Sequence, residues 1–160
     1  MICYYQLNLY TGKVGYVFTG KNIRWNIIPI YFGNFIGAGA VSLPIRYIKP
    51  ELVDTAKALA AHKLEMGIFS IIISSIACGI LMYLAVDNYK NNSNMMAKNL
   101  GIIMCVAVFI LNGFEHSIAD MNYFFLGLNN YTQIGWTIGF LGLVSIGNAL
   151  GAWCARLVTK

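Results

Sequence analysis

Long apolar stretches separated by short polar segments run through the whole chain. The apolar stretches cover residues 26–47, 66–86, 99–128 and 134–158. About 20 apolar residues are needed for a helix to cross the hydrocarbon core of a bilayer, so this pattern predicts about four membrane-spanning helices. The segment Met1 to Tyr10 is apolar but too short to span, and it is predicted to be a stub, the end of a helix whose beginning is absent. The stretch from Lys49 to Lys63 is hydrophilic and rich in alanine, which favours a short helix at the membrane interface.

The third apolar stretch is too long for one crossing and contains an interruption. Asn112-Gly113 favours a turn, and it is followed by Phe114-Glu115-His116-Ser117-Ile118-Ala119-Asp120. Ionisable side chains at membrane depth are costly and usually mark a pathway or a proton relay. Non-helical backbone at that depth requires protein or a water-filled cavity to satisfy it. The pattern therefore predicts a broken transmembrane helix with a proton-active His116 near the middle of the bilayer.

The short loops carry most of the basic residues. Seven Lys and Arg lie on one predicted side (13, 21, 24, 90, 98, 156 and 160) and four on the other (46, 49, 57 and 63). Since basic loops stay on the cytoplasmic side, the N-terminal loop and the C-terminus are predicted to be cytoplasmic. For Lys57, Lys63 and Glu65 the sequence favours a solvated helix face. The alternative for Lys63 is a place at a pore mouth, where its charge would attract anions.

Composition supports a membrane protein and argues against several other classes. The chain is 58% hydrophobic and 11% charged, whereas soluble domains are about a quarter charged. The net charge of +5 is spread over short segments, so nucleic acid is not expected as a partner. The two histidines and four cysteines lack the spacing of metal ligands, and neither a metal nor a cofactor is predicted. Residues 1–160 are predicted to form a single all-α integral membrane domain, surrounded by lipid.

A short motif occurs twice, in the first and last predicted full spans. Gly33-Asn34-Phe35-Ile36-Gly37-Ala38 recurs as Gly147-Asn148-Ala149-Leu150-Gly151-Ala152. The two spans are predicted to run in opposite directions, as in an inverted-topology repeat. Small residues allow close approach of helices in lipid, and Asn34 and Asn148 are expected to form interhelical hydrogen bonds.

These features together resemble the formate/nitrite transporter family. The resemblance rests on GNxxG within Asn26 to Gly37, on the run from Gly113 to Ala119, and on Gly147-Asn148 with Gly151. It covers nearly the whole chain but only the C-terminal two-thirds of a family member. It implies an aquaporin-like helix bundle with one pore per subunit, assembled as a homopentamer in a cell membrane, such as the bacterial inner membrane. The family conducts small monovalent anions and is not enzymatic.

The resemblance also implies roles for individual residues. His116 matches the central pore histidine, Phe109 an aromatic residue of the constriction, and Lys63 a lysine of the outer funnel. Glu115 and Asn148 match polar residues that support the histidine loop.

Other positions depart from the family. The family usually has asparagine where Gly79 and Asp120 stand, so the supporting network is expected to be rearranged. Asp120 is either a second titrating group or a paired structural acid. The family's first helix and broken second helix are expected to be absent, so no residue would face His116 in place of the family's threonine.

The predicted function is passage of a small weak-acid anion such as formate, nitrite or hydrosulfide. A bare anion is costly to desolvate, and a histidine, whose pKa is near neutral, suits proton exchange with it. Ordinary core or lipid-facing packing remains the alternative for Phe109. A truncated, transport-inactive fragment or structural subunit is the alternative function. A membrane enzyme using Glu115 and His116 is disfavoured, since no nucleophile, metal set or cofactor motif accompanies them.

Overall fold

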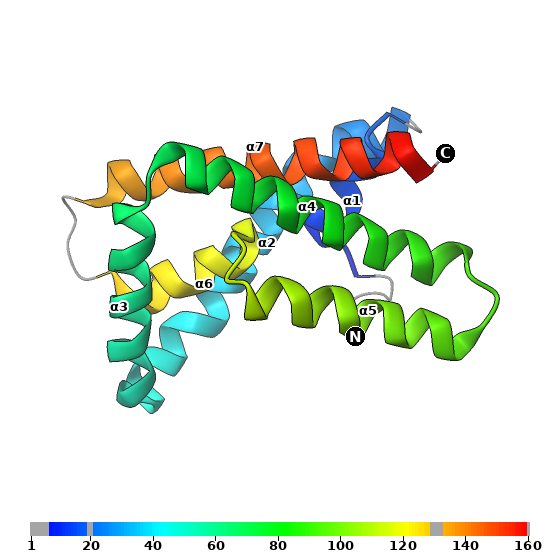
Figure 1. The fold of residues 1–160 in the computed structure, drawn as a ribbon. Coiled ribbons are helices and arrows are strands. Elements are labelled where there is room, and N and C mark those ends of the chain that lie inside the picture. Colours follow the sequence, from blue (N-terminus) through cyan, green and yellow to red (C-terminus); the bar gives the residue numbers. More distant parts are fainter. Residues whose placement is uncertain (1–6, 19–20, 129–132, 160) are drawn as a thin grey trace.

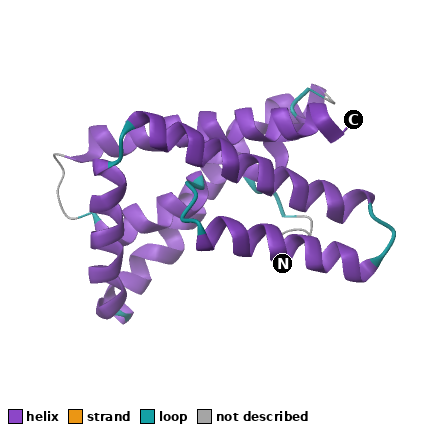
Figure 2. Cartoon of the chain, viewed as in Figure 1, coloured by secondary structure: helices purple, strands orange, loops and turns teal. Residues whose placement is uncertain are grey.

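A computed structural model describes residues 7–18, 21–128 and 133–159, and helices account for nearly all of these residues (Figure 2). Predictions for residues 1–6 of the stub, for 129–132 of the last turn and for Lys160 lie outside the described residues, as do the side chains of residues 21–24. The elements in chain order are α1 (Tyr10–Lys13), η1 (Val14–Tyr16), α2 (Lys21–Ile48), α3 (Pro50–Glu65), α4 (Ile68–Asn91), α5 (Met95–Leu111), α6 (Ser117–Gly127) and α7 (Ile134–Thr159).

Three of the described helices are long and apolar enough to cross a membrane. They contain the spans Trp25–Ile48, Ile68–Asn91 and Ile134–Thr159, which agree with three of the predicted spans. The fourth predicted span, residues 99–128, consists of α5 and α6, and neither helix is long enough to cross alone. The chain is therefore an all-α integral membrane protein with three full-length spans in its described part.

The predicted helix interruption lies between α5 and α6. Gly113 has φ of 63°, a left-handed conformation that favours glycine. The amide of Phe114 donates to the carbonyl of Phe109 at 3.0 Å, which closes the end of α5. Residues 114–116 are not helical, and the chain resumes helical geometry at Ser117.

Several predicted boundaries are wrong near the N-terminus. The first span is predicted to begin at residue 26, but α2 begins at Lys21, and α1 and η1 precede it. Pro29 and Pro44 both lie inside α2. Proline is tolerated inside membrane helices because neighbouring groups satisfy the backbone that it leaves unpaired.

Helices α4 and α7 run side by side and form the most extensive helix pair in the described chain (Figure 1). Glycines make this approach possible. A Cβ added at Gly151 would overlap the backbone of Ile76, and one added at Gly147 would overlap Ser75. The matching glycines of the first motif copy, Gly33 and Gly37, have no atom within 4 Å of an added Cβ. The two copies of the motif therefore differ in their surroundings.

Two apolar clusters hold the remaining elements together. One joins α3, α6 and α7 through residues such as Ala60, Phe124 and Val144. The other joins η1 to α4 and α7 through Val14, Tyr83 and Ala152. The second cluster fixes the short N-terminal elements against α4 and α7.

Candidate functional site

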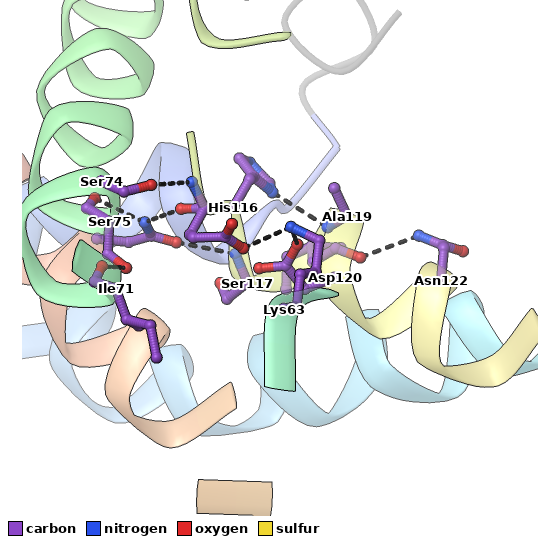
Figure 3. A network of polar contacts seen from close by, with 12 residues as sticks. Lys63, Ile71, Ser74, Ser75, His116, Ser117, Ala119, Asp120 and Asn122 are labelled. Atoms are coloured by element: carbon purple, nitrogen blue, oxygen red, sulfur yellow. Dashed lines mark hydrogen bonds and ion pairs between the residues drawn. The ribbon is translucent and has the colours of Figure 1, made fainter. Parts of the chain in front are cut away.

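His116 lies directly before α6 and is only 6% exposed. Its Nδ1 accepts a hydrogen bond from the amide of Ala119 at 3.2 Å (Figure 3), so the imidazole caps the N-terminus of α6. Its Nε2 lies 3.0 Å from Oγ1 of Thr11. Because Nδ1 acts as the acceptor, the neutral ring carries its hydrogen on Nε2 and donates it to Thr11.

Thr11 is the main functional candidate that sequence reasoning missed. It is 1% exposed, in the first turn of α1. The expectation that no residue faces His116 is therefore wrong. A helix of four residues is too short to show periodicity, and the contact joins positions 105 apart in the sequence. The available signal was the family's threonine that faces the histidine. A search for a threonine near residue 10 would have found Thr11.

Asn148 fixes the backbone on both sides of His116. Its side-chain oxygen accepts from the amide of Ser117 at 3.0 Å. Its side-chain NH₂ group donates to the carbonyls of Glu115 at 2.9 Å and Ser75 at 2.8 Å. All these contacts are buried, so Asn148 ties α7, α4 and the histidine segment together, in agreement with the predicted interhelical hydrogen bonding.

Asn34, its counterpart in the first motif copy, does the same for the segment that carries Thr11. Its side-chain oxygen accepts from the amide of Tyr10 at 2.9 Å, and its NH₂ group donates to the carbonyl of Asn8 at 3.0 Å. Each copy of the motif thus supplies an asparagine that holds one of two segments, and these segments meet at the Thr11–His116 contact.

The C-terminal half of α7 also holds the N-terminal segment. Nε1 of Trp153 donates to the carbonyl of Val14, and the Arg156 guanidinium donates to the carbonyl of Gly15, each at 2.9 Å. These contacts satisfy carbonyls at the end of the short helical elements. They place Thr11 by fixing the backbone that follows it.

Lys63 lies in a buried cluster with two acids. Its Nζ is 2.6 Å from Oε2 of Glu115 and 3.0 Å from Oδ1 of Asp120 (Figure 3). The solvated-face interpretation is therefore wrong for Lys63, which is 7% exposed, because α3 packs this side chain against α6. Lys57, by contrast, is exposed and pairs with Asp54 at 2.9 Å, as a solvated face predicts.

Glu115 has a second anchor in α4. Its backbone amide donates to Oγ of Ser74 at 2.8 Å (Figure 3). The segment before α6 is therefore held by α3 through the Glu115 side chain, and by α4 and α7 through its backbone. Such multiple anchoring restricts the orientation of the adjacent imidazole.

Phe109 lies in the last turn of α5 and is half-buried. Its ring stacks on the imidazole of His116, with ring centroids 5.5 Å apart and an interplanar angle of 27°. The break between α5 and α6 brings the two rings together. The structure thus places Phe109, His116 and Thr11 in one contiguous group.

Gly79, one of the two positions that depart from the family, lies against Asn148. A Cβ at Gly79 would overlap the backbone carbonyl of Asn148. No side chain fits there while α4 and α7 keep this separation. The supporting network is accordingly built from the side chains of Asn148 and Ser74 and the backbone carbonyl of Ser75, with no contribution from a side chain at position 79.

Together these observations define a helical membrane protein with a buried polar centre where an interrupted helix meets a short N-terminal element. Residues 1–159 match the model of the formate/nitrite transporter family, and the chain belongs to that family. The family consists of transporters and channels, and the membrane-enzyme alternative is set aside.

Individual relatives agree with this assignment. The chain is 29% identical over 121 residues to the formate channel FocA of Haemophilus influenzae, and the aligned region covers 72% of this chain and 42% of FocA. It is 30% identical over 140 residues to the uncharacterized transporter YwcJ of Bacillus subtilis (80% and 55% covered). It is 29% identical over 147 residues to the nitrite transporter NirC of Salmonella typhimurium (86% and 54% covered). The chain thus spans about half the length of these relatives.

The fold is similar to that of a solved structure, an FNT family ion channel. The TM-score is 0.74 at 24% sequence identity, and the match covers 95% of this chain and 66% of that one. At this identity the likeness concerns the fold alone.

Proposed function

We propose that the chain forms a membrane channel or transporter for small monovalent weak-acid anions of the formate, nitrite or hydrosulfide class. Family membership and relatives named as a formate channel and a nitrite transporter support this substrate class. The observation that carries the proposal is the buried contact between Nε2 of His116 and Oγ1 of Thr11, at 3.0 Å. It provides a polar, proton-exchanging point between otherwise apolar helices.

In the proposed mechanism, His116 supplies or shares a proton with the anion. Removing an anion from water is costly, and protonation to the neutral acid removes most of that cost. In the neutral ring Nδ1 accepts from the amide of Ala119 and Nε2 carries the hydrogen, so His116 shares this hydrogen with the anion through a hydrogen bond. Complete transfer of a proton to the anion starts from the imidazolium, whose second hydrogen is on Nδ1 and replaces the bond from Ala119. Thr11 would then orient the Nε2 hydrogen, and Phe109 would form part of an apolar constriction that excludes water.

The other predicted residues serve mainly to hold this arrangement. Asn148 and Asn34 position the two segments, and Glu115 anchors the histidine segment to Lys63. The sequence suggested that Lys63 concentrates anions at a pore mouth. Its ammonium instead contacts the carboxyl groups of Glu115 and Asp120, so we assign it the role of fixing these two side chains.

The proposed architecture is an aquaporin-like bundle in a bacterial plasma membrane, with the subunits assembled as a homopentamer. Of the three full-length spans in the described part of the chain, α4 and α7 are connected by α5 with α6, and α1 with η1 precedes α2. In this arrangement the segment of α1 with η1 and the break between α5 and α6 meet at His116. The paired roles of Asn34 and Asn148 in the repeated motif support this view.

The test is anion uptake into proteoliposomes that contain this chain, with formate, nitrite and hydrosulfide offered under a pH gradient. His116→Ala is expected to abolish a selective flux. His62→Ala is the matched control, since His62 is the other histidine and is exposed on α3, and it should conduct like the parent chain. Equal flux in both variants would refute the role of His116.

A second candidate is the alternative given by the sequence, a transport-inactive structural subunit. Absence of flux for every anion, from protein with full helical content, would support this candidate. Flux that appears only when a full-length family member is co-reconstituted would identify the chain as its partner.

A further inference from the structure

The start of α6 buries more negative than positive charge. Lys63 Nζ contacts Oε2 of Glu115 and Oδ1 of Asp120, and in the described part of the chain no other basic side chain forms an ion pair with either acid. All three side chains are at least nine-tenths buried. If every group were ionised, the cluster would carry one uncompensated negative charge. Buried charge without a partner is strongly destabilising, so this state is costly.

Asp120 is the less satisfied of the two acids. Its Oδ2 has no hydrogen-bond partner among the described residues, and the same holds for Oγ of Ser117, one helical turn earlier. The two carboxyl groups are close neighbours, because Lys63 Nζ contacts one oxygen of each, at 2.6 and 3.0 Å. Two carboxylates that share one ammonium repel each other, and protonation of one of them removes this repulsion. Neighbouring carboxylates in such sites share one proton.

The groups that surround the pair do not supply a second positive charge. From α4, the neighbouring titratable group is the thiol of Cys78, which is fully buried. From α6, the Tyr123 ring lies 5.4 Å from Lys63 Nζ. From α7, Asn148 contributes a neutral amide to the carbonyl of Glu115.

The remaining neighbouring elements also contribute neutral groups. On α2, the polar contact to α6 is made by the Ser42 hydroxyl with Asn122. On α1, Thr11 contacts His116, whose Nδ1 accepts a hydrogen bond from a backbone amide and does not contact the acids.

We propose that Glu115 and Asp120 together bind one proton, and that this proton-binding site is distinct from the imidazole of His116. With the proton bound, the cluster consists of one ammonium, one carboxylate and one carboxylic acid, and it is neutral. Release of the proton converts the acid to a second carboxylate and leaves one negative charge directly beside the histidine segment. The release transfers H⁺ alone and needs no other reactant.

For anion passage, this inference rests on the proposed function. A negative charge next to the pathway repels an approaching anion, so flux should fall as pH rises and the pair loses its proton. At a separation of roughly 10 Å and an intermediate effective dielectric constant, one charge changes the local anion concentration on the order of tenfold. Asp120→Asn keeps the size of the side chain, removes the extra charge, and should flatten the fall of flux at high pH by about this factor.

The decisive test does not depend on transport. Infrared difference spectra of the reconstituted full chain, in H₂O and D₂O, report the C=O stretch of a protonated carboxyl group as pH changes. A buried, titrating carboxyl band is expected in the parent chain and should be lost in both Asp120→Asn and Glu115→Gln. Glu65→Gln removes an exposed acid of α3 and should leave the band unchanged.

Either of two results would overturn the inference: no protonated carboxyl band near neutral pH, or a band that persists in both variants. The two variants guard against a folding defect in one of them, because each removes one member of the pair. An inactive chain that shows the band would refute the proposed function and leave the proton site intact. A conducting chain without the band would refute the proton site and leave the proposed function intact.

Discussion

A matched pair of glycine substitutions tests whether the two copies of the GNxxGA motif differ in packing. Gly151 and Gly37 occupy the same motif position on α7 and α2. A Cβ at Gly151 would overlap the carbonyl of Ile76 and lie 3.0 Å from the amide nitrogen of Ile80, both on the α4 backbone. A Cβ at Gly37 would meet nothing within 4 Å. We expect Gly151→Ala to destabilise the fold and Gly37→Ala to stabilise it.

The size of the difference follows from two terms. Alanine stabilises a helix interior by about 1 kcal/mol relative to glycine at either position. Overpacking costs about 1–3 kcal/mol. The upper end applies to Gly151, because the obstacle is backbone and cannot rotate away. The net expectation is a loss of about 2 kcal/mol for Gly151→Ala and a gain of about 1 kcal/mol for Gly37→Ala.

The assay is equilibrium unfolding of the purified chain in mixed micelles, with sodium dodecyl sulfate as the denaturant and helical circular dichroism as the signal. Equal stabilities for the two variants would refute the reasoning, since the packing of α4 on α7 is the only difference invoked. If Gly37→Ala leaves unfolding unchanged but alters the size of the assembly, the open face of α2 packs on another chain.

Three further predictions concern the polar centre. Thr11→Val removes the acceptor of the His116 Nε2 hydrogen, so it should lower the free energy of unfolding by about 1–3 kcal/mol and reduce the anion flux. Thr11→Ser keeps the hydroxyl group, and an equal loss in this variant would contradict the prediction. Asn148→Leu strands three buried backbone groups and should lower the melting temperature more than Asn34→Leu, whose contacts are partly exposed; equal losses would argue against the difference in burial. Lys63→Met leaves two buried acids unpaired and should cost about 3–5 kcal/mol in the same unfolding assay, and a loss below about 1 kcal/mol, typical of exposed pairs, would refute the buried cluster.

The positions of the long helices and of the break were predictable because they depend on local composition. Hydropathy alone defines a span, and Asn112-Gly113 alone defines a stop. The helices α2, α4 and α7 follow the predicted spans closely, and Gly113 has the left-handed backbone that such a stop requires.

The contacts of the polar centre were less predictable, because they join residues far apart in the chain. The placement of Thr11 depends on Asn34, Trp153 and Arg156, which hold the backbone around it. The burial of Lys63 depends on the packing of α3 against α6. No local pattern contains this information, and the charge of Lys63 favoured an exposed position.

The family resemblance identified candidates but not their partners. Phe109, His116, Glu115 and Asn148 lie together as expected, and their functional roles remain predictions. For Asp120 the sequence allows either a titrating group or a paired structural acid. It forms an ion pair and yet retains an oxygen without a partner in the described residues, which is the basis of the proton site proposed above.

The meeting of the two repeated halves at the Thr11–His116 contact has an electrical consequence. In the proposed inverted arrangement, this contact lies about midway through the transmembrane field. A unit charge that crosses 100 mV changes in energy by about 2.3 kcal/mol, so a proton that reaches the imidazole from either side gains or loses about half of that energy. Protonation of the site from one face should therefore respond to voltage by about sevenfold per 100 mV. The dependence should have the same size from both faces, so the depth of the site by itself gives neither direction of transport an electrical advantage.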